Sequence, residues 1–205
     1  MGRTDSYPCS KPAISWVLKV KLIETNLADC FIIELDRHDD VRGSFMRGFD
    51  KEDFRSLGLP LSIDHTAEAI NHSAFTLRGL HFQSPSHPEF KLVRCLRGTI
   101  FDVVVDIRKN SRTFGRWQSL RLHASDAKCL FVPAGLAHGY LTLSPSSVVS
   151  YLLFTPYIAE AQRGLLWNDP DLAINWPANP RVIADRDQQF PFFSQISSTD
   201  FQFQV

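Results

Sequence analysis

The chain has 205 residues, 44% of them hydrophobic, and so contains enough apolar material for one substantial core. Its 22 basic residues balance its 22 acidic residues. A chain without net charge has neither the basic footprint of a nucleic-acid-binding protein nor a general attraction to anionic membranes. We therefore predict a single domain over 1–205 that binds no nucleic acid and no membrane. Residues 1–20 and 196–205 are expected to be loosely ordered extensions, because chain ends without a packing partner are often poorly ordered.

The N-terminal residues and the cysteines predict the cellular compartment. The first twenty residues lack the basic, apolar and small-residue order of a signal peptide, and Lys19 and Lys21 interrupt their apolar runs. No C-x-x-C pair occurs among the four widely spaced cysteines, which are Cys9, Cys30, Cys95 and Cys129. This spacing is typical of reduced thiols, so we expect a cytoplasmic protein.

Short apolar stretches separated by glycine and proline favour a β-rich domain over a helical bundle. Strands are predicted, in chain order, at 30–35, 91–96, 99–107, 119–122, 129–132 and 148–154. One short helix is expected after the first strand, where Asp50 can cap it, Glu52 and Asp53 suit its first turn, and Gly58 can end it. This arrangement predicts a sandwich or a closed barrel whose interior can hold a small ligand.

Polar residues recur within the apolar stretch 78–83. Arg78, His81 and Gln83 stand at every second or third position, so in an extended strand several of them point the same way. Lys91 and Asp102 lie on adjoining predicted strands and are hard to place by packing alone. Pattern alone leaves His81 open to two interpretations, a structural histidine and a functional one.

A second motif lies at 133–138. Pro133, Gly135 and His138 have the P-x-G-x-x-H spacing of the second half of the cupin signature. The first half normally supplies H-x-H and Glu for a metal ion, whereas residues 80–83 read Leu-His-Phe-Gln. A three-histidine metal site cannot be assembled from these motifs. We therefore expect a cupin-like jelly roll without a metal centre, in which His138 is either a turn residue or a functional one.

Three other residues have ordinary structural interpretations. Tyr151 and Tyr157 are typical of barrel-lining aromatics whose hydroxyls face water. Asp187 belongs to the run Asp185-Arg186-Asp187, which by pattern alone favours a solvated surface.

Seven motifs taken together resemble the dTDP-4-dehydrorhamnose 3,5-epimerase family over about residues 29–187. Any one of them is weak, but their order and spacing are specific. The motifs are DVRGSF at 40–45, TLRGLHFQ at 76–83, KLVR at 91–94, FDVVVDIR at 101–108, SRTFGRW at 111–117, PAGLAHG at 133–139 and WNDP at 167–170.

The resemblance implies an all-β, cupin-like jelly roll with a few short helices. It also implies a cofactor-independent, homodimeric isomerase that inverts C3, C5 or both carbons of a nucleotide-linked 4-keto-6-deoxyhexose. His81 would be the catalytic base, Asp187 its carboxylate partner, Tyr151 the proton donor and Lys91 the active-site lysine. The implied substrate contacts are Arg42, Asn71, Arg78, Gln83, His138 and Tyr157.

The chemistry accounts for these residue types. Both carbons are alpha to the C4 carbonyl, so removal of a proton gives an enolate that a cation such as Lys91 can stabilise. An imidazole titrates near neutral pH and suits the base, and a donor on the opposite face completes the inversion. No Gly-rich dinucleotide turn occurs, in agreement with a reaction that has no redox step.

Two departures from the family pattern leave alternatives open. Arg47 stands where the family commonly has Glu, and the usual Gln two positions before Asn71 is missing. Another nucleotide, or inversion of one carbon only, therefore stays open. A non-catalytic sugar-binding module is the competing class, and a metal-dependent oxygenase is a third interpretation.

Overall fold

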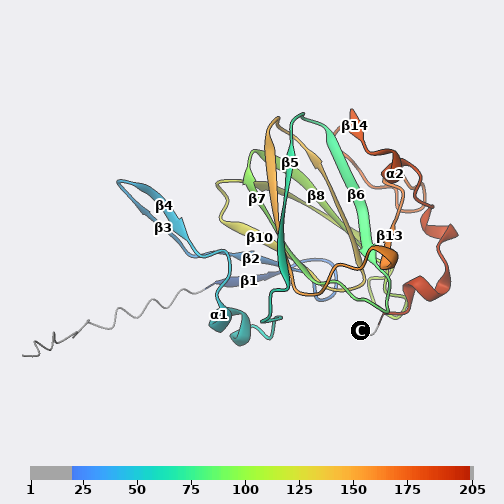
Figure 1. The fold of residues 1–205 in the computed structure, drawn as a ribbon, viewed down its shortest axis with the longest axis horizontal. Coiled ribbons are helices and arrows are strands. Elements are labelled where there is room, and N and C mark those ends of the chain that lie inside the picture. Colours follow the sequence, from blue (N-terminus) through green and yellow to red (C-terminus); the bar gives the residue numbers. More distant parts are fainter. Residues whose placement is uncertain (1–19, 204–205) are drawn as a thin grey trace, which may run out of the picture.

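The structure, a computed structural model, describes residues 20–203, and its body is two β-sheets packed face to face (Figure 1). Cys9 and nearly all of the expected N-terminal extension lie outside the described residues. The first sheet has the order β1-β2-β10-β7-β12-β5. Its strands are β1 Lys21–Glu24, β2 Phe31–Glu34, β5 His65–Asn71, β7 Lys91–Arg97, β10 Lys128–Val132 and β12 Ser147–Leu153.

The second sheet has the order β13-β6-β11-β8-β9, with the short strand β14 beside β6. Its strands are β6 Thr76–Gln83, β8 Thr99–Asp106, β9 Trp117–His123, β11 Leu136–Thr142, β13 Gln162–Gly164 and β14 Val182–Ile183. All pairs are antiparallel except β14 with β6. This is the expected all-β, jelly-roll architecture.

The remaining elements are a hairpin and short helices. The hairpin of β3 Arg37–Asp40 and β4 Gly43–Met46 projects from the body (Figure 1). The helices are α1 Lys51–Ser56, α2 Asp185–Gln188, and the 3-10 turns η1 Ala159–Ala161, η2 Phe193–Gln195 and η3 Ser198–Phe201. No helix between residues 20 and 203 is long and apolar enough to cross a membrane.

Apolar side chains fill three layers. One cluster lies between the sheets and includes Val93, Val104 and Leu136. A second covers the outer face of the first sheet, where Phe54 of α1 packs, and a third covers the second sheet. The third cluster contains Phe201 and Phe203, which are 7% and 5% exposed. Phe201 and Phe203 therefore pack against the body, whereas the loosely ordered C-terminal extension expected at 196–205 stays a prediction for the residues around them.

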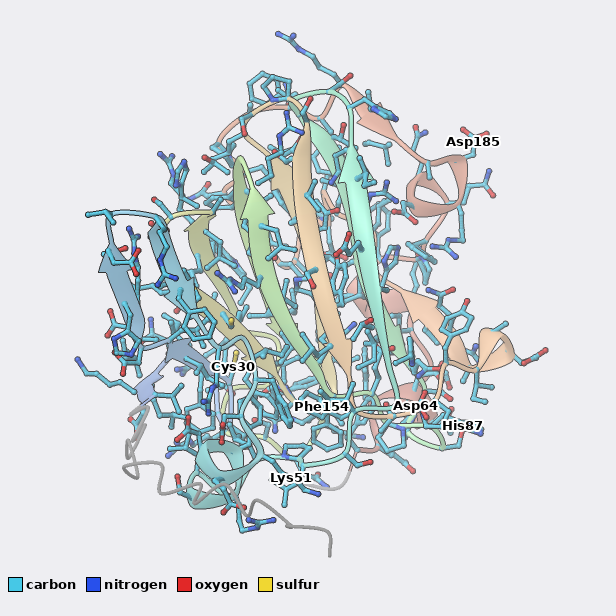
Figure 2. All side chains as sticks on the ribbon, turned by 60° about the vertical axis from the view of Figure 1, so that its left-hand side comes forward. Cys30, Lys51, Asp64, His87, Phe154 and Asp185 are labelled. Atoms are coloured by element: carbon cyan, nitrogen blue, oxygen red, sulfur yellow. The ribbon has the colours of Figure 1, made fainter. Side chains whose placement is uncertain are left out.

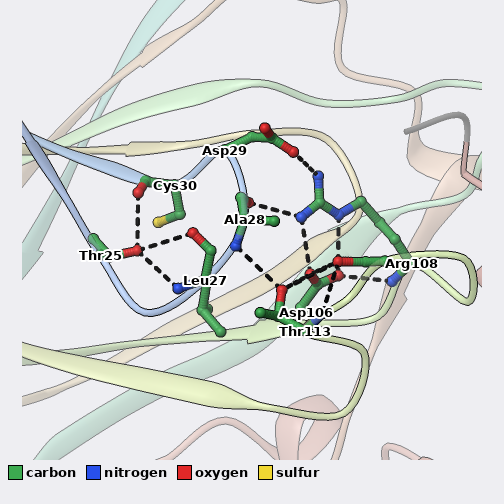
Figure 3. A network of polar contacts seen from close by, with 9 residues as sticks. Thr25, Leu27, Ala28, Asp29, Cys30, Asp106, Arg108 and Thr113 are labelled. Carbon is green, nitrogen blue, oxygen red and sulfur yellow. Dashed lines mark hydrogen bonds and ion pairs between the residues drawn. The ribbon is translucent and has the colours of Figure 1, made fainter.

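A buried charge network ties the loop between β1 and β2 to the end of β8 (Figure 3). The Arg108 guanidinium, 3% exposed, donates to both carboxylate oxygens of Asp106 at 3.0 and 2.8 Å and to Asp29 at 2.8 Å. Thr113 donates to Asp106 at 2.6 Å and accepts from the backbone N–H of Ala28 at 3.1 Å. Burial alone would raise the pKa of Asp106, but these donors lower it below its ordinary value.

The predicted elements are confirmed where local pattern is strong. The structure has a strand at each of the six predicted positions, and Asp50 caps α1 by accepting from the N–H groups of Glu52 and Asp53. Apolar pattern did not predict the β3–β4 hairpin or the strands β1, β5, β11, β13 and β14. Strand β5 follows no clear apolar alternation, and β11 is buried at every position, a pattern that periodicity cannot separate from a buried helix. The single-domain organisation stays a prediction.

We expect Asp106→Ala to lower the free energy of unfolding by about 3–5 kcal/mol, because the buried Arg108 cation then loses its main partner. Urea unfolding followed by circular dichroism measures the change. Asp171→Ala, at an exposed carboxylate before β14, is the matched control and should change stability little. Equal effects of the two substitutions would contradict the role assigned to the network.

Candidate active site

Strands β6 and β11 bring two histidines to the same place. His81 and His138 are direct partners across the antiparallel pair, and the register shifts between His138 and Tyr140. At this irregularity the two backbones touch: a Cβ on Gly79 would lie 2.6 Å from the Cα of Gly139, and a Cβ on Gly139 would lie 2.7 Å from the carbonyl oxygen of Arg78. Only glycine fits at these two positions. The register shift also explains why the side chains of Arg78 and His81, three positions apart on β6, both point toward the other sheet.

A pocket of about 190 Å³ opens at the end of the sandwich that Asp64 and His87 mark in Figure 2. Residues from both sheets line it. Among them are five predicted site residues, His81, Gln83, Lys91, Tyr151 and Tyr157, and the others are His65, Ala67, Phe82, Glu89, Leu153 and Gln162.

His81 and Asp187 form a hydrogen-bonded pair. The Nε2 atom of His81 lies 2.9 Å from Oδ1 of Asp187, and the other carboxylate oxygen accepts from the N–H of Gly79 at 3.0 Å. Asp187, which pattern alone placed on a solvated surface, is 2% exposed. Because Asp187 takes the Nε2 hydrogen, Nδ1 is left as the proton-accepting atom, and it has no hydrogen-bond partner among residues 20–203.

The electrostatics of this pair favour a neutral imidazole beside an ionised carboxylate. Burial lowers the pKa of His81 below its ordinary value of 6.5; Lys91 and Arg186 act in the same direction, and Asp187 opposes them. Burial by itself would raise the pKa of Asp187. The hydrogen bonds from His81 and Gly79 and the charge of Arg186 together outweigh burial, so the pKa lies below its ordinary value. His81 is thus held as a base near neutral pH.

Lys91 and Tyr151 face His81 from the other sheet. His81 is on β6 of the second sheet, whereas Lys91 begins β7 and Tyr151 lies on β12 of the first. The Lys91 ammonium, 7% exposed on its side chain, forms an ion pair with Glu89. Burial raises the pKa of Tyr151 well above its ordinary value of 10, so its hydroxyl is protonated. A base and a protonated acid therefore stand on opposite walls of one pocket.

His138 lies behind this pocket, outside its lining. Its Nε2 atom is 2.7 Å from Oδ1 of Asp102, and both side chains are buried. The Oδ2 atom of Asp102 has no hydrogen-bond partner among the described residues. His138 also contacts the Tyr151 ring edge-on, with 6.1 Å between centroids. His138 therefore packs against Tyr151, the residue predicted to be the proton donor.

The predicted contacts Asn71 and Arg78 join the two sheets. The Arg78 Nε atom donates to Asn71 Oδ1 at 2.9 Å, and the amide nitrogen of Asn71 donates to the carbonyls of Ala69 and Ser147. Asn71 is 2% exposed, so its amide holds Arg78 in place. Gln83 similarly bonds the backbone at Pro156 and Ile158, and so fixes the segment that carries Tyr157.

Arg42, another predicted site residue, lies on the projecting hairpin and not in the pocket lining. It lies in the turn of the β3–β4 hairpin, its side chain is 86% exposed, and it forms an ion pair with Asp40. Within one chain the hairpin projects away from the sheets (Figure 1).

Three polar residues of the pocket lining were not predicted from the sequence, namely His65, Glu89 and Gln162. Glu89 precedes Lys91 by two positions, and this same-face spacing could have indicated it. Gln162 accepts from both Tyr157 and Arg186 at 2.9 Å, and His65 pairs with Asp64 at 2.8 Å. Both stand in stretches without a recognisable motif. Between residues 20 and 203, no three His, Cys, Asp or Glu side chains gather as metal ligands would.

We expect the imidazole of His81 to titrate below pH 6.5, and Asp187→Asn to lower its pKa further, because the variant removes the one negative charge that stabilises the imidazolium. Two-dimensional NMR of ¹⁵N-labelled histidine measures both values. His123, exposed and distant on β9, is the internal control. A His81 pKa that rises in Asp187→Asn would contradict this electrostatic account.

Comparison with known proteins places this geometry in a family. The family described as dTDP-4-dehydrorhamnose 3,5-epimerase matches residues 24–195. A dTDP-4-dehydrorhamnose 3,5-epimerase from Sinorhizobium fredii is 38% identical over 172 residues, which is 83% of this chain and 88% of that protein.

Two solved structures have the same fold. The Legionella pneumophila dTDP-6-deoxy-D-glucose-3,5-epimerase, in complex with dTDP-4-keto-L-rhamnose, superposes with a TM-score of 0.85 at 30% identity, over 91% of this chain and all (100%) of that one. A 3'-monoepimerase from Streptomyces bikiniensis, in complex with dTDP-quinovose, has a TM-score of 0.78 at 30% identity, over 83% and 86% of the two chains. The chain belongs to the dTDP-4-dehydrorhamnose 3,5-epimerase family of isomerases.

Proposed function

We propose that this protein inverts C3, C5 or both carbons of a nucleotide-linked 4-keto-6-deoxyhexose by proton abstraction and opposite-face reprotonation. One observation carries the proposal: His81 and Tyr151 line a single pocket from opposing sheets. A binding module needs a pocket of suitable shape and polarity, but it needs no base opposite an acid.

The reaction follows from the residues. Nδ1 of His81 takes the proton alpha to the C4 carbonyl, and the C–H electron pair moves into an enolate. Asp187 accepts the Nε2 hydrogen throughout and stabilises the imidazolium that forms. The Lys91 ammonium balances the negative charge on the enolate oxygen. Tyr151 then gives its phenolic proton to the opposite face of the carbon, which completes the inversion.

The rest of the substrate lies along the opening between the sheets. Tyr157 is 53% exposed at the rim and can stack on the nucleobase. Arg78 can bind the diphosphate, because it is held at the opening by Asn71. The dTDP named in the relatives supports thymine as the base. Inversion of one carbon stays the second candidate, because a structural relative is a 3'-monoepimerase. The buried thiols of Cys30, Cys95 and Cys129 support a reducing, cytoplasmic location.

The exposed apolar side chains of the β3–β4 hairpin support a homodimer. Residues 31–33 of β2 cannot add a strand to a neighbour's sheet, because β2 is already paired on both sides, with β1 and β10. The β3–β4 hairpin instead presents apolar Val41 and Phe45, which are 104% and 61% exposed. Packing of this hairpin on a second copy would bury both and carry Arg42 to that copy.

Two variants separate the base from the acid. His81→Asn should abolish inversion and deuterium uptake at C3 and C5, because no enolate forms. Tyr151→Phe should lower inversion by about two to four orders of magnitude, whereas deuterium still enters with retention, since His81 can return an exchanged proton to the same face. Proton NMR of the substrate in heavy water measures both. Complete loss of exchange in Tyr151→Phe would show that Tyr151 does more than donate the proton, and rapid inversion by His81→Asn would exclude the base assignment.

Light scattering should give twice the chain mass of 23.3 kDa for the wild type, and the double variant Val41→Asp, Phe45→Asp should shift the protein to the monomer, because two buried carboxylates would oppose packing of the hairpin. Val182→Asp, at another exposed apolar residue on β14, is the control and should stay dimeric. A monodisperse 23.3 kDa wild type would exclude the dimer.

A further inference from the structure

Phe190 packs directly against the imidazole of His81. The centroids of the two rings lie 5.7 Å apart and their planes meet at 78°, which is an edge-to-face contact. Phe190 stands two residues beyond the end of α2, the helix that carries Asp187. It does not line the pocket that holds Tyr151, and the mechanism above gives it no role.

Gly164 provides the space that this ring occupies. Gly164 on β13 is the direct register partner of His81 on β6, and the side chains of directly paired residues lie on the same face of a sheet. A Cβ on Gly164 would lie 2.4 to 2.5 Å from three atoms of the Phe190 ring. A larger residue at position 164 would therefore push the ring away from its place beside His81.

The Phe190 ring also supports Arg186. The guanidinium carbon of Arg186 lies 5.9 Å from the ring centroid, within the range of a cation–π contact. The same guanidinium lies 3.5 Å from Nε2 of His81 and 3.4 Å from Oδ1 of Asp187. One aromatic ring thus holds both the base and a positive charge beside it.

A single hydrogen bond does not fix the orientation of the imidazole. Nε2 of His81 bonds Asp187, but Nδ1, the proposed proton acceptor, has no hydrogen-bond partner among the described residues. The ring could tilt about the Nε2 contact, and a misplacement of about 1 Å at a catalytic group can slow a reaction by about a hundredfold. The edge-to-face contact with Phe190 opposes this tilt and covers part of the ring from water.

We propose that Phe190 is a positioning residue for the base: seated on Gly164, its ring fixes the His81 imidazole against Asp187 and keeps water from one side of it. Phe190 acts through His81 without contact with the sugar, since it lies outside the pocket lining. Its role in catalysis rests on the proposed function, whereas its effect on the imidazole does not.

The electrostatics of His81 give this contact a measurable direction. Burial is the main cause of the lowered pKa of His81, and Lys91 and Arg186 also lower it, against Asp187. Phe190 contributes to the burial and supports Arg186. Loss of its ring therefore weakens two of these causes, and both changes raise the pKa of His81. The other titratable groups around the imidazole are His138 across the strand pair and, in the pocket lining, His65, Glu89, Tyr151 and Tyr157.

The variant Phe190→Ala removes the ring. We expect the pKa of His81, measured in the substrate-free protein by NMR of ¹⁵N-labelled histidine, to rise by about half a unit or more. The acid limb of kcat/KM should move to higher pH by the same amount. At about pH 8, where the imidazole is neutral in both proteins, kcat should still fall by about tenfold because the base is no longer held in place, while KM stays near its wild-type value.

Phe193→Ala is the matched control, because it removes a ring of the same size from the same segment, where Phe193 packs on Phe114 and Phe201. It should leave the pKa of His81 and the pH profile unchanged. Gly164→Ala tests the seat of the ring. Its methyl group should displace Phe190 and lower kcat, whereas in the Phe190→Ala background the same methyl group should add little, because no ring is left for it to meet.

A His81 pKa in Phe190→Ala equal to or below that of the wild type, or equal losses of kcat in Phe190→Ala and Phe193→Ala, overturns the positioning role. An undiminished effect of Gly164→Ala in the absence of the ring overturns it as well. A wild type that neither inverts the sugar nor exchanges deuterium, while Phe190→Ala raises the pKa of His81 as expected, overturns the proposed function instead. The two failures are therefore distinguishable.

Discussion

Strands β6 and β11 approach so closely at Gly79 and Gly139 that neither position has room for a side chain. This contact shifts the register of the pair and sets His81 beside His138. It also turns the N–H of Gly79 toward Asp187, which reaches the site from a helix more than a hundred residues later. The geometry of the base thus depends on two glycines that carry no chemistry themselves.

Around this contact each buried carboxylate of the site has a nitrogen-bearing side chain as its partner. Asp187 faces His81, Glu89 faces Lys91 and Asp102 faces His138. A lone buried charge would be expensive, and pairing reduces that cost while keeping the groups ready for proton transfer. The division between the sheets matters equally, because it places His81 on one wall of the pocket and Lys91 and Tyr151 on the other.

The residues that stabilise the fold differ from those that line the pocket. The Arg108 network anchors the loop before β2 at the end of β8, away from the pocket lining, and the C-terminal aromatic residues cover the outer face of the second sheet. Both features stabilise the sandwich at places that do not line the pocket. The interior is then free to carry polar groups such as Tyr140 and Asn71, which an interior devoted to packing alone would exclude.

Sequence alone was sufficient for the strands with strong apolar pattern, for helix α1 with its Asp50 cap, and for the family, because these depend on neighbouring residues or on ordered motifs. It also identified five residues that line the pocket. The burial of Asp187 and the positions of Gln162 and Glu89 were decided only by tertiary structure. Each depends on contacts between segments far apart in the chain, and a local pattern cannot distinguish a buried carboxylate from a solvated one, since burial is a property of the packed sheets.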